Sequence, residues 1–286
     1  MAETKLTKLR ELLRSYGSCL VAYSGGVDSV FLAYVAHEVL REKSLAVIAD
    51  SPSLPRRELQ DAVKIAEEFS FSVRVVSTKE FQNASYLANP NNRCYFCKHE
   101  LFTELESIAR DEKFAVIAYG ENASDTGDHR PGTKAAAEFQ VRAPLKEVGL
   151  TKSEIREFSA RLGLPTADKP QMACLSSRIP HGEIVSTEKL QMIEAAENLL
   201  RDLGFFDVRV RHHELGSKST ESAGELKTCL ARMEIGADEM KRIFANDLFV
   251  EIAEKLKQIG YAHVTLDLQG YRRGSLNERS IRFSKT

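Results

Sequence analysis

The chain has 286 residues, of which 43% are hydrophobic and 28% are charged, and its formal net charge is −1. This length suits one large domain or two modest ones, and the near-neutral charge argues against a strongly basic nucleic-acid binder. No apolar run approaches the roughly 20 residues of a membrane span and the charged N-terminus has no signal-peptide core, so we expect a cytoplasmic protein with no membrane partner.

The first 119 residues alternate between strand-like and helix-like segments after an amphipathic helix over 4–16. The expected strands are short, continuous apolar runs over 18–23, 45–49, 72–77 and 114–119. The expected helices lie between them, over 27–43, 56–69 and 98–110. Such strands are typical of a sheet that is buried on both faces. The pattern predicts an α/β fold with a parallel sheet and helices on both sides, whose ligands bind beyond the carboxyl ends of the strands.

The pattern then changes twice along the chain. Two long irregular stretches, 120–144 and 166–182, flank a helix over 152–162, and loops of this length are usually functional or disordered. Later segments read as helix 187–203, strands 207–212 and 228–235, a long helix 237–259 and a strand 262–268. We therefore predict two domains, 1–184 and 185–286, the second a smaller α+β domain with partly antiparallel strands.

The sequence SGGVDS, residues 24–29, joins the first predicted strand to the next helix. Gly25 and Gly26 let the backbone approach an anion closely, the helix N-terminus attracts phosphate, and Ser24 and Ser29 add hydroxyl donors. Asp28 would hold a Mg²⁺ ion that bridges phosphates. The absence of a lysine excludes the usual P-loop. An ordinary strand–turn–helix junction, with Asp28 as a helix-start residue, is the alternative.

SGGVDS resembles the PP-loop of the ATP pyrophosphatases. These enzymes cleave ATP between its α- and β-phosphates, adenylylate a carbonyl or carboxylate oxygen and release pyrophosphate. The resemblance implies that the turn holds the β- and γ-phosphates. Lys98, at the start of a predicted helix, is our candidate for a supplementary cation. Asp125 and Arg130 follow the fourth predicted strand, and we assign them to the nucleotide or its metal.

The five cysteines fall into two groups. Cys19 and Cys229 lie in apolar strands and are most simply core residues, whereas Cys94, Cys97 and Cys174 lie in loop-like sequence. A C-x-x-C pair can also be a redox pair or half of a zinc site, but a second pair is absent and the surroundings do not resemble a thioredoxin motif. Three thiolates can hold three irons of a [4Fe–4S] cluster, which leaves the fourth iron open to exogenous sulfide.

Several further segments together resemble one family, LarE, the ATP-dependent sulfurtransferases of nickel-pincer cofactor biosynthesis. The segments are GENASDTGDHRPG (120–132), APLKEVGLTKSEIREFSARLGLPTADKP (143–170), ACLSSRIPHG (173–182), VRVRHH (208–213) and VTLDLQGYRRGSLN (264–277). The resemblance covers nearly the whole chain. It implies that a carboxylate of pyridinium-3,5-biscarboxylic acid mononucleotide is adenylylated, and that sulfur then replaces the adenylate to give the thiocarboxylate. It also suggests a homo-oligomer.

Members of this family differ in their sulfur source. One type sacrifices the sulfur of a single cysteine, matched here by Cys174, and another type binds a [4Fe–4S] cluster through three cysteines. The extra pair, Cys94 and Cys97, indicates the second type. Single-turnover sacrifice of the Cys174 sulfur is the alternative.

Arg209 and Arg211 alternate on a predicted strand, so their side chains share one face. Two guanidiniums suit a phosphate and a carboxylate, and the resemblance places both arginines in the sulfur-transfer pocket. Glu234 and Glu197 are expected to add acidic groups there, although Glu197 is equally well read as an ordinary helix residue.

Three other functions fit parts of the sequence. A tRNA thiolase of the same superfamily can also use three cysteines, but the neutral chain has no evident basic stripe. An amidating enzyme such as NAD synthetase leaves the three cysteines unexplained. A non-catalytic sensor would bind ATP without releasing pyrophosphate.

Overall fold

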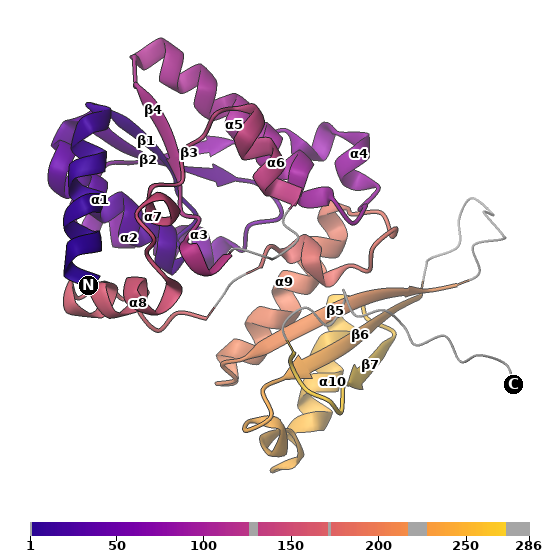
Figure 1. The fold of residues 1–286 in the computed structure, drawn as a ribbon. Helices are drawn as coiled ribbons and strands as arrows, with labels where there is room; N and C mark the ends of the chain where they lie inside the picture. The colour runs from indigo at the N-terminus through magenta and orange to yellow at the C-terminus, as the bar shows by residue number, and fades with distance from the viewer. Residues whose placement is uncertain (1, 126–130, 171–172, 217–227, 273–286) are drawn as a thin grey trace, which may run out of the picture. The chain divides into compact units, whose positions relative to one another are not determined.

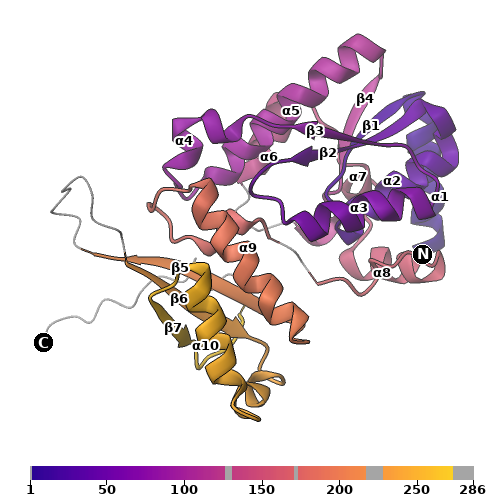
Figure 2. The same ribbon diagram turned by 180° about the vertical axis from the view of Figure 1, so that it is seen from behind.

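The computed structural model describes residues 2–125, 131–170, 173–216 and 228–272. The chain divides into two compact units, Met1–Cys174 and Leu175–Thr286, which Figures 1 and 2 show from opposite sides. The boundary expected near residue 184 falls within the second unit. Among the described residues, no helix combines the length and the apolar character that crossing a membrane requires.

The first unit is built on a four-stranded sheet in the order β3-β2-β1-β4, and every neighbouring pair is parallel. The strands are β1 (Cys19–Ala22), β2 (Ser44–Asp50), β3 (Val73–Ser77) and β4 (Val116–Tyr119). All four residues of the central strand β1 are buried, as expected for a strand covered on both faces. The predicted parallel sheet is therefore confirmed, and the segments after its strands share one edge.

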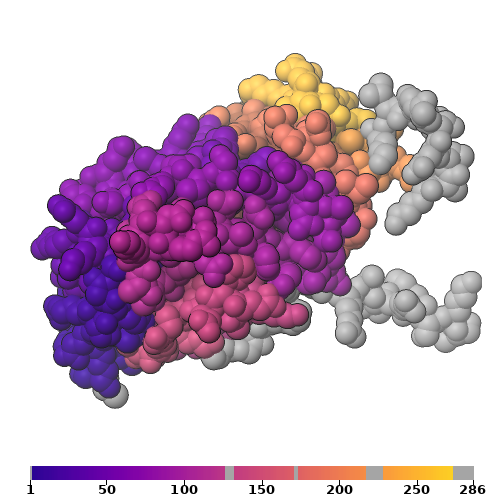
Figure 3. Space-filling view, turned by 90° about the horizontal axis from the view of Figure 1, so that it is seen from above, coloured from indigo at the N-terminus to yellow at the C-terminus, as the bar shows by residue number. Residues whose placement is uncertain are grey.

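Helices cover both faces of this sheet (Figures 1 and 2). The first face carries α1 (Ala2–Tyr16), α2 (Val27–Leu40), α3 (Arg56–Glu68) and α8 (Lys152–Arg161). The second face carries α5 (Arg93–Glu112) and α6 (Pro131–Glu138), and α5 is prominent in the view of Figure 3. Alternate residues of β1 enter the two cores, Cys19 and Val21 on the first side and Leu20 and Ala22 on the second, because successive strand side chains point to opposite faces.

Short elements connect the larger ones, and the first unit differs from the sequence-based expectations at two places. They are η1 (Arg41–Lys43), η2 (Glu80–Gln82), α4 (Ala84–Leu87), η3 (Ala123–Asp125) and α7 (Pro144–Glu147). The expectation of an irregular chain over 120–144 is wrong in part, because α6 forms there and buries Ala135 and Ala136 in the second core. Helix α5 begins at Arg93 rather than Lys98, because the buried Arg93 side chain is anchored by a hydrogen bond to Asn89 Oδ1.

The second unit is a three-stranded sheet in the order β5-β6-β7, covered by two helices. Its elements are η4 (Leu175–Arg178), α9 (Thr187–Asp202), β5 (Val208–Leu215), β6 (Thr228–Ile235), η5 (Met240–Phe244), α10 (Leu248–Ile259) and β7 (His263–Leu266). β5 and β6 are antiparallel and β6 and β7 parallel, as predicted. The expected continuous helix over 237–259 is wrong, because Asn246 and Asp247 have φ of 50° and 56° and left-handed residues interrupt a helix.

Candidate active site

The turn between β1 and α2 needs one of its two glycines for its own geometry. Gly25 has a φ of +69°, and a Cβ there would lie 2.8 Å from the Cβ of Ala62 in α3. Gly26 has an ordinary φ of −85°, and a Cβ there would meet only the Ser24 hydroxyl, at 3.5 Å. The fold therefore demands glycine at position 25, whereas at position 26 the missing side chain leaves the backbone open to a ligand.

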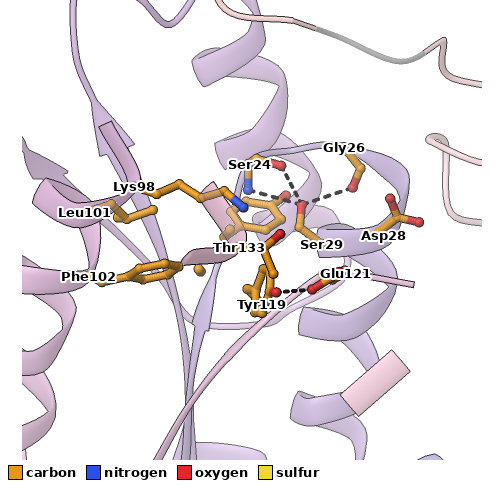
Figure 4. A pocket seen from close by; sticks show the side chains of 13 residues that line it. Ser24, Gly26, Asp28, Ser29, Lys98, Leu101, Phe102, Tyr119, Glu121 and Thr133 are labelled. Atoms are coloured by element: carbon orange, nitrogen blue, oxygen red, sulfur yellow. Dashed lines mark hydrogen bonds between the residues drawn. The ribbon is translucent and has the colours of Figure 1, made fainter. Parts of the chain in front are cut away.

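Two serines hold the turn in shape (Figure 4). The Ser29 hydroxyl accepts a hydrogen bond from Ser24 N at 3.1 Å, lies 3.0 Å from Ser24 Oγ and donates to Gly26 O at 3.1 Å. No described side chain caps the N-terminus of α2 at Gly26. Backbone N–H groups in the first turn of a helix have no partner within the helix, and together with the helix dipole they attract anions.

A cavity of about 200 Å³ opens beside this turn. Lys98 reaches into it from α5, and its Nζ lies 4.9 Å from the centre of the Tyr119 ring (Figure 4). At the end of β4, a Cβ on Gly120 would come within 3.0 Å of Ser29 N, so this glycine lets the strand end pack against the start of α2. The cavity is lined by Ala22, Tyr23, Ser24, Gly26, Asp28, Ser29, Lys98, Leu101, Phe102, Tyr119, Gly120, Glu121 and Thr133.

Asp28 lies in this cavity and contacts residues that sequence reasoning did not assign. Its Oδ2 is 2.6 Å from Lys152 Nζ, and its Oδ1 accepts a hydrogen bond from Asn122 Nδ2 at 3.3 Å. Burial raises the pKa of Asp28 above its ordinary value and the nearby Asp125 raises it further, while Lys152 and Asn122 act in the opposite direction. The carboxylates of Asp28 and Asp125 are suitable donors for a hard divalent cation.

Two further lysines surround the turn. Lys152 is the first residue of α8, whose start is fixed by a capping box between Thr151 and Glu154. Lys169 Nζ donates to Gly25 O at 3.2 Å and lies 2.6 Å from Glu58 Oε2. With Lys98 they bring three lysines to the surroundings of the turn, although Lys152 and Lys169 are paired with the carboxylates of Asp28 and Glu58. The T-x-x-E pattern is a sequence signal for the helix start, but nothing local in the sequence indicates that either lysine reaches the turn.

Of the two other residues assigned to the nucleotide, Asp125 and Arg130, the structure describes Asp125. Asp125 closes η3, and its Oδ2 accepts a hydrogen bond from Asn122 N at 3.1 Å. Arg130 lies outside the described residues. At the cavity edge, Glu121 bonds with Lys146 at 2.9 Å and with the Tyr119 hydroxyl. Burial alone would raise the pKa of Glu121, but these hydrogen bonds outweigh it and hold the pKa below its usual range.

The C-x-x-C pair lies in the first turn of α5 rather than in a loop. Cys94 and Cys97 are three residues apart in the helix, a spacing that places side chains on one face. Arg93, which directly precedes the pair, is 4% exposed and has its Nη2 3.9 Å from Cys174 Sγ. The three thiols are close enough to influence one another electrostatically, and all belong to the first unit.

Both thiols of the pair have a pKa above the ordinary value of a cysteine. Burial raises the pKa of Cys97 well above its ordinary value, and the charges of Glu80, Cys174 and Cys94 raise it further. Cys94 lies at the surface, but the protein atoms around its thiol still raise its pKa, and Cys174 adds to the effect. A helix N-terminus favours thiolates, but burial has the larger effect on both thiols and raises their pKa.

The structure does not contain an assembled metal centre within its described ranges. No group of three or more His, Cys, Asp or Glu side chains there is arranged to hold a metal ion. The assignment of Cys94, Cys97 and Cys174 to a cluster therefore stays a prediction.

A separate cluster of buried charges occupies the second unit. Arg178 in η4 and Glu197 in α9 are both 0% exposed, and they form a bidentate pair at 2.8 and 3.0 Å. Glu197 also bonds with Arg201 at 3.1 Å and accepts from Val210 N at 3.1 Å. Burial would raise the pKa of Glu197, but the surrounding arginines lower it. Arg178 was not assigned from the sequence, although it lies in the segment ACLSSRIPHG.

The two arginines of β5 lie in the same unit. Their alternation places Arg209 and Arg211 on the face opposite Val208 and Val210. Arg209 is 4% exposed and stacks on the Tyr271 ring at 4.8 Å. Burial lowers the pKa of Arg209, and the like charge of Arg178 lowers it further.

Arg211 and Glu234 form a direct ion pair. Arg211 Nη2 is 2.6 Å from Glu234 Oε2, and Arg211 Nη1 donates to Ser177 O at 2.9 Å. The fully buried Glu234 also contacts Arg232 at 3.0 Å. Both carboxylate oxygens of Glu234 are thus engaged by arginines.

Several known proteins are similar to this chain in sequence. The family model described as NAD synthase matches residues 3–106. The chain is 41% identical over 277 residues to an uncharacterized protein of Synechocystis, covering 97% of this chain and 98% of that protein. It is 30% identical to the pyridinium-3,5-bisthiocarboxylic acid mononucleotide synthase of Lactiplantibacillus plantarum, covering 96% and 94%. An uncharacterized protein of Methanocaldococcus jannaschii is 27% identical, covering 94% of this chain and 97% of its own.

A parallel sheet with SGGVDS at the carboxyl end of its central strand defines the PP-loop class of ATP-using enzymes. The match to the NAD synthase model ends within α5, whereas the match to the L. plantarum enzyme extends through both units. The chain belongs to the LarE family, the family of that synthase.

Proposed function

We propose that the protein is an ATP-dependent sulfurtransferase that makes a thiocarboxylate from pyridinium-3,5-biscarboxylic acid mononucleotide. ATP adenylylates a substrate carboxylate with release of pyrophosphate, and sulfur then displaces AMP from the acyl adenylate. The observation that carries the proposal is that one helix, α5, bears both halves of the site. Cys94 and Cys97 lie in its first turn, and the next residue, Lys98, lines the cavity at the PP-loop.

The ATP half rests on the charges around the turn. The amides at the start of α2, with Lys98, Lys152 and Lys169 nearby, suit the β- and γ-phosphates and then the departing pyrophosphate. Asp28 and Asp125 are oxygen donors that fit Mg²⁺, the ion that usually accompanies nucleotide phosphates. In this proposal Lys152 leaves Asp28 for a phosphate oxygen when the metal binds.

The second unit supplies the recognition of the anionic substrate in this proposal. The mononucleotide carries a phosphate and two carboxylates, and guanidinium groups bind both in a bidentate manner. Arg209 and Arg211 share one face of β5, and Glu234 and Tyr271 orient them. The buried pair of Arg178 and Glu197 fixes η4 against α9, and η4 directly follows Cys174 in the chain.

The sulfur source proposed is a [4Fe–4S] cluster on Cys94, Cys97 and Cys174. Three soft thiols are the ligand type that iron–sulfur clusters use, and the buried Arg93 beside Cys174 can offset thiolate charge. The raised pKa values mean that loading must displace protons and draw the thiols together, as metal binding commonly does. When bound, the cluster would offer an open iron to exogenous sulfide.

The test is anaerobic reconstitution of the full chain with iron and sulfide, followed by counting of thiocarboxylate formed per protein. We expect several turnovers and a visible cluster absorption, and loss of both in Cys94→Ala and Cys97→Ala. Cys229→Ala, which alters a half-buried cysteine of the second unit, is the matched control and should behave as the parent.

The sacrificial alternative has a distinct result. In that case Cys94→Ala and Cys97→Ala would each still give one thiocarboxylate per chain, and the protein would lose about the mass of hydrogen sulfide as Cys174 becomes dehydroalanine. That outcome overturns the cluster and leaves the ATP half in place. Absence of pyrophosphate release with the mononucleotide would overturn the adenylylation itself.

A further inference from the structure

A glycine of α6 makes close contact with the lysine that reaches into the PP-loop cavity. Gly132 is the second residue of α6, and it is buried. A Cβ at this position would lie 2.4 Å from Lys98 Cδ, 2.9 Å from Lys98 Cε and 3.2 Å from Lys98 Nζ. The space that a side chain at position 132 would take is therefore filled by the side chain of Lys98.

The backbone itself does not require glycine at position 132. The residue lies in a helix, and its φ is outside the left-handed range, so alanine would adopt the same conformation without strain. Glycine is also a poorer helix former than alanine. What explains the glycine is the lysine that it accommodates, and not the fold of α6.

The surroundings of Lys98 keep its side chain extended into the cavity (Figure 4). The Tyr119 ring lies 4.9 Å from Lys98 Nζ. Helix α6 cannot easily draw back from Lys98, because Ala135 and Ala136 are buried in the core that α5 also enters. Since the PP-loop turn lines the same cavity, the contact with Gly132 bears directly on where the ammonium group stands relative to that turn.

We propose that Gly132 is a positioning residue of the ATP site, which gives Lys98 the room to extend into the cavity and to place its ammonium group at the phosphates. The inference rests on the proposed function, since it presumes ATP at the PP-loop. A methyl group at position 132 would be relieved most cheaply by rotation of Lys98, because the far end of a lysine side chain is flexible whereas α6 is anchored in the core. Such a rotation removes a charge-assisted contact with phosphate and leaves the fold unchanged.

The probe is ATP with Mg²⁺, titrated into the full chain of the parent, Gly132→Ala, Lys98→Ala and the double variant. We expect Gly132→Ala to raise the Kd for ATP by about 10-fold or more, as the loss of one charge-assisted contact should. The double variant should bind ATP no more weakly than Lys98→Ala, because two residues that act through one contact are not additive. Lys134→Ala is the matched control, since it removes an exposed lysine of α6 outside the cavity lining, and it should bind ATP as the parent does.

A second measurement separates positioning from packing. Because alanine favours the helix and Lys98 can turn aside, the thermal midpoint of ATP-free Gly132→Ala should be no lower than that of the parent. Three results would each overturn the role of Gly132 and leave the PP-loop site in place: parental ATP affinity in Gly132→Ala, a midpoint well below that of the parent, or a further loss of affinity in the double variant relative to Lys98→Ala. If the parent itself binds no ATP, the proposed function fails and the role of Gly132 fails with it.

Discussion

At the residue scale, the environment of Asp28 balances opposing electrostatic effects. Burial and Asp125 raise its pKa, and Lys152 and Asn122 lower it. In the proposed function, a divalent ion would replace Lys152 as the partner of Asp28.

Replacing Asp28 with asparagine should therefore separate function from folding. We expect Asp28→Asn to lower the rate of pyrophosphate release by at least about 100-fold, because the amide offers a metal one neutral oxygen. Stability in urea should change by less than about 1 kcal/mol, since the ion pair with Lys152 is partly exposed to solvent. Asp61→Asn, an exposed position of α3, is the control, and normal release by Asp28→Asn would remove the assigned role.

At the element scale, the PP-loop turn uses its two glycines for different purposes. Gly25 is needed because of its left-handed φ and its contact with α3, whereas Gly26 is conformationally ordinary. A pair of alanine variants tests this division.

Gly25→Ala should destabilise the first unit by about 1–3 kcal/mol, from backbone strain and the clash with Ala62. Gly26→Ala should lower the free energy of unfolding by less than about 1 kcal/mol. The variant should bind ATP more weakly, because the new Cβ projects where the phosphates are expected. Urea unfolding and ATP titration measure the two effects. Equal losses of stability would contradict the distinction between the glycines.

Helix α5 carries both the cysteine pair and Lys98. Its early start at Arg93 brings the cysteine pair into the first turn, next to Lys98. The sequence marked Cys94, Cys97 and Lys98 as candidate site residues and predicted that the helix begins at Lys98. It missed the helix start, because the buried Arg93 is stabilised by contacts with Asn89 and Cys174 that no local pattern encodes.

At the scale of the whole molecule, the stability of the second unit should depend on pH through one buried histidine. His212 is 0% exposed, and its Nδ1 lies 3.4 Å from the Tyr261 hydroxyl. Burial lowers the pKa of His212 to about 4, and the charge of Lys189 lowers it further.

The sign of the effect follows from proton binding. Between about pH 6.5 and pH 4 the unfolded chain binds a proton at His212 and the folded chain does not, so the free energy of unfolding falls as the solution is acidified. The full loss is roughly 3 kcal/mol, and above pH 6.5 this histidine contributes no pH dependence. Urea titrations across this range should show a weaker dependence in His212→Leu than in the parent. His263→Leu, at an exposed position, should keep the parental slope.

The sequence by itself determined the features that depend on short stretches of chain. The apolar strands, the SGGVDS turn and the change of pattern before residue 187 are local, and they were enough to predict a parallel sheet with its ligand edge and a partly antiparallel second sheet. The family resemblance likewise followed from contiguous motifs, and the comparison over both units confirms it.

Only the tertiary structure decided which distant side chains meet at that edge. Lys152 reaches Asp28 across 124 residues of chain, and Lys169 reaches Gly25 across 144. The pairing of Arg178 with Glu197 is of the same kind. Long, charged side chains have no periodicity that reveals their partners, because the partner is set by how helices and loops pack on the sheet.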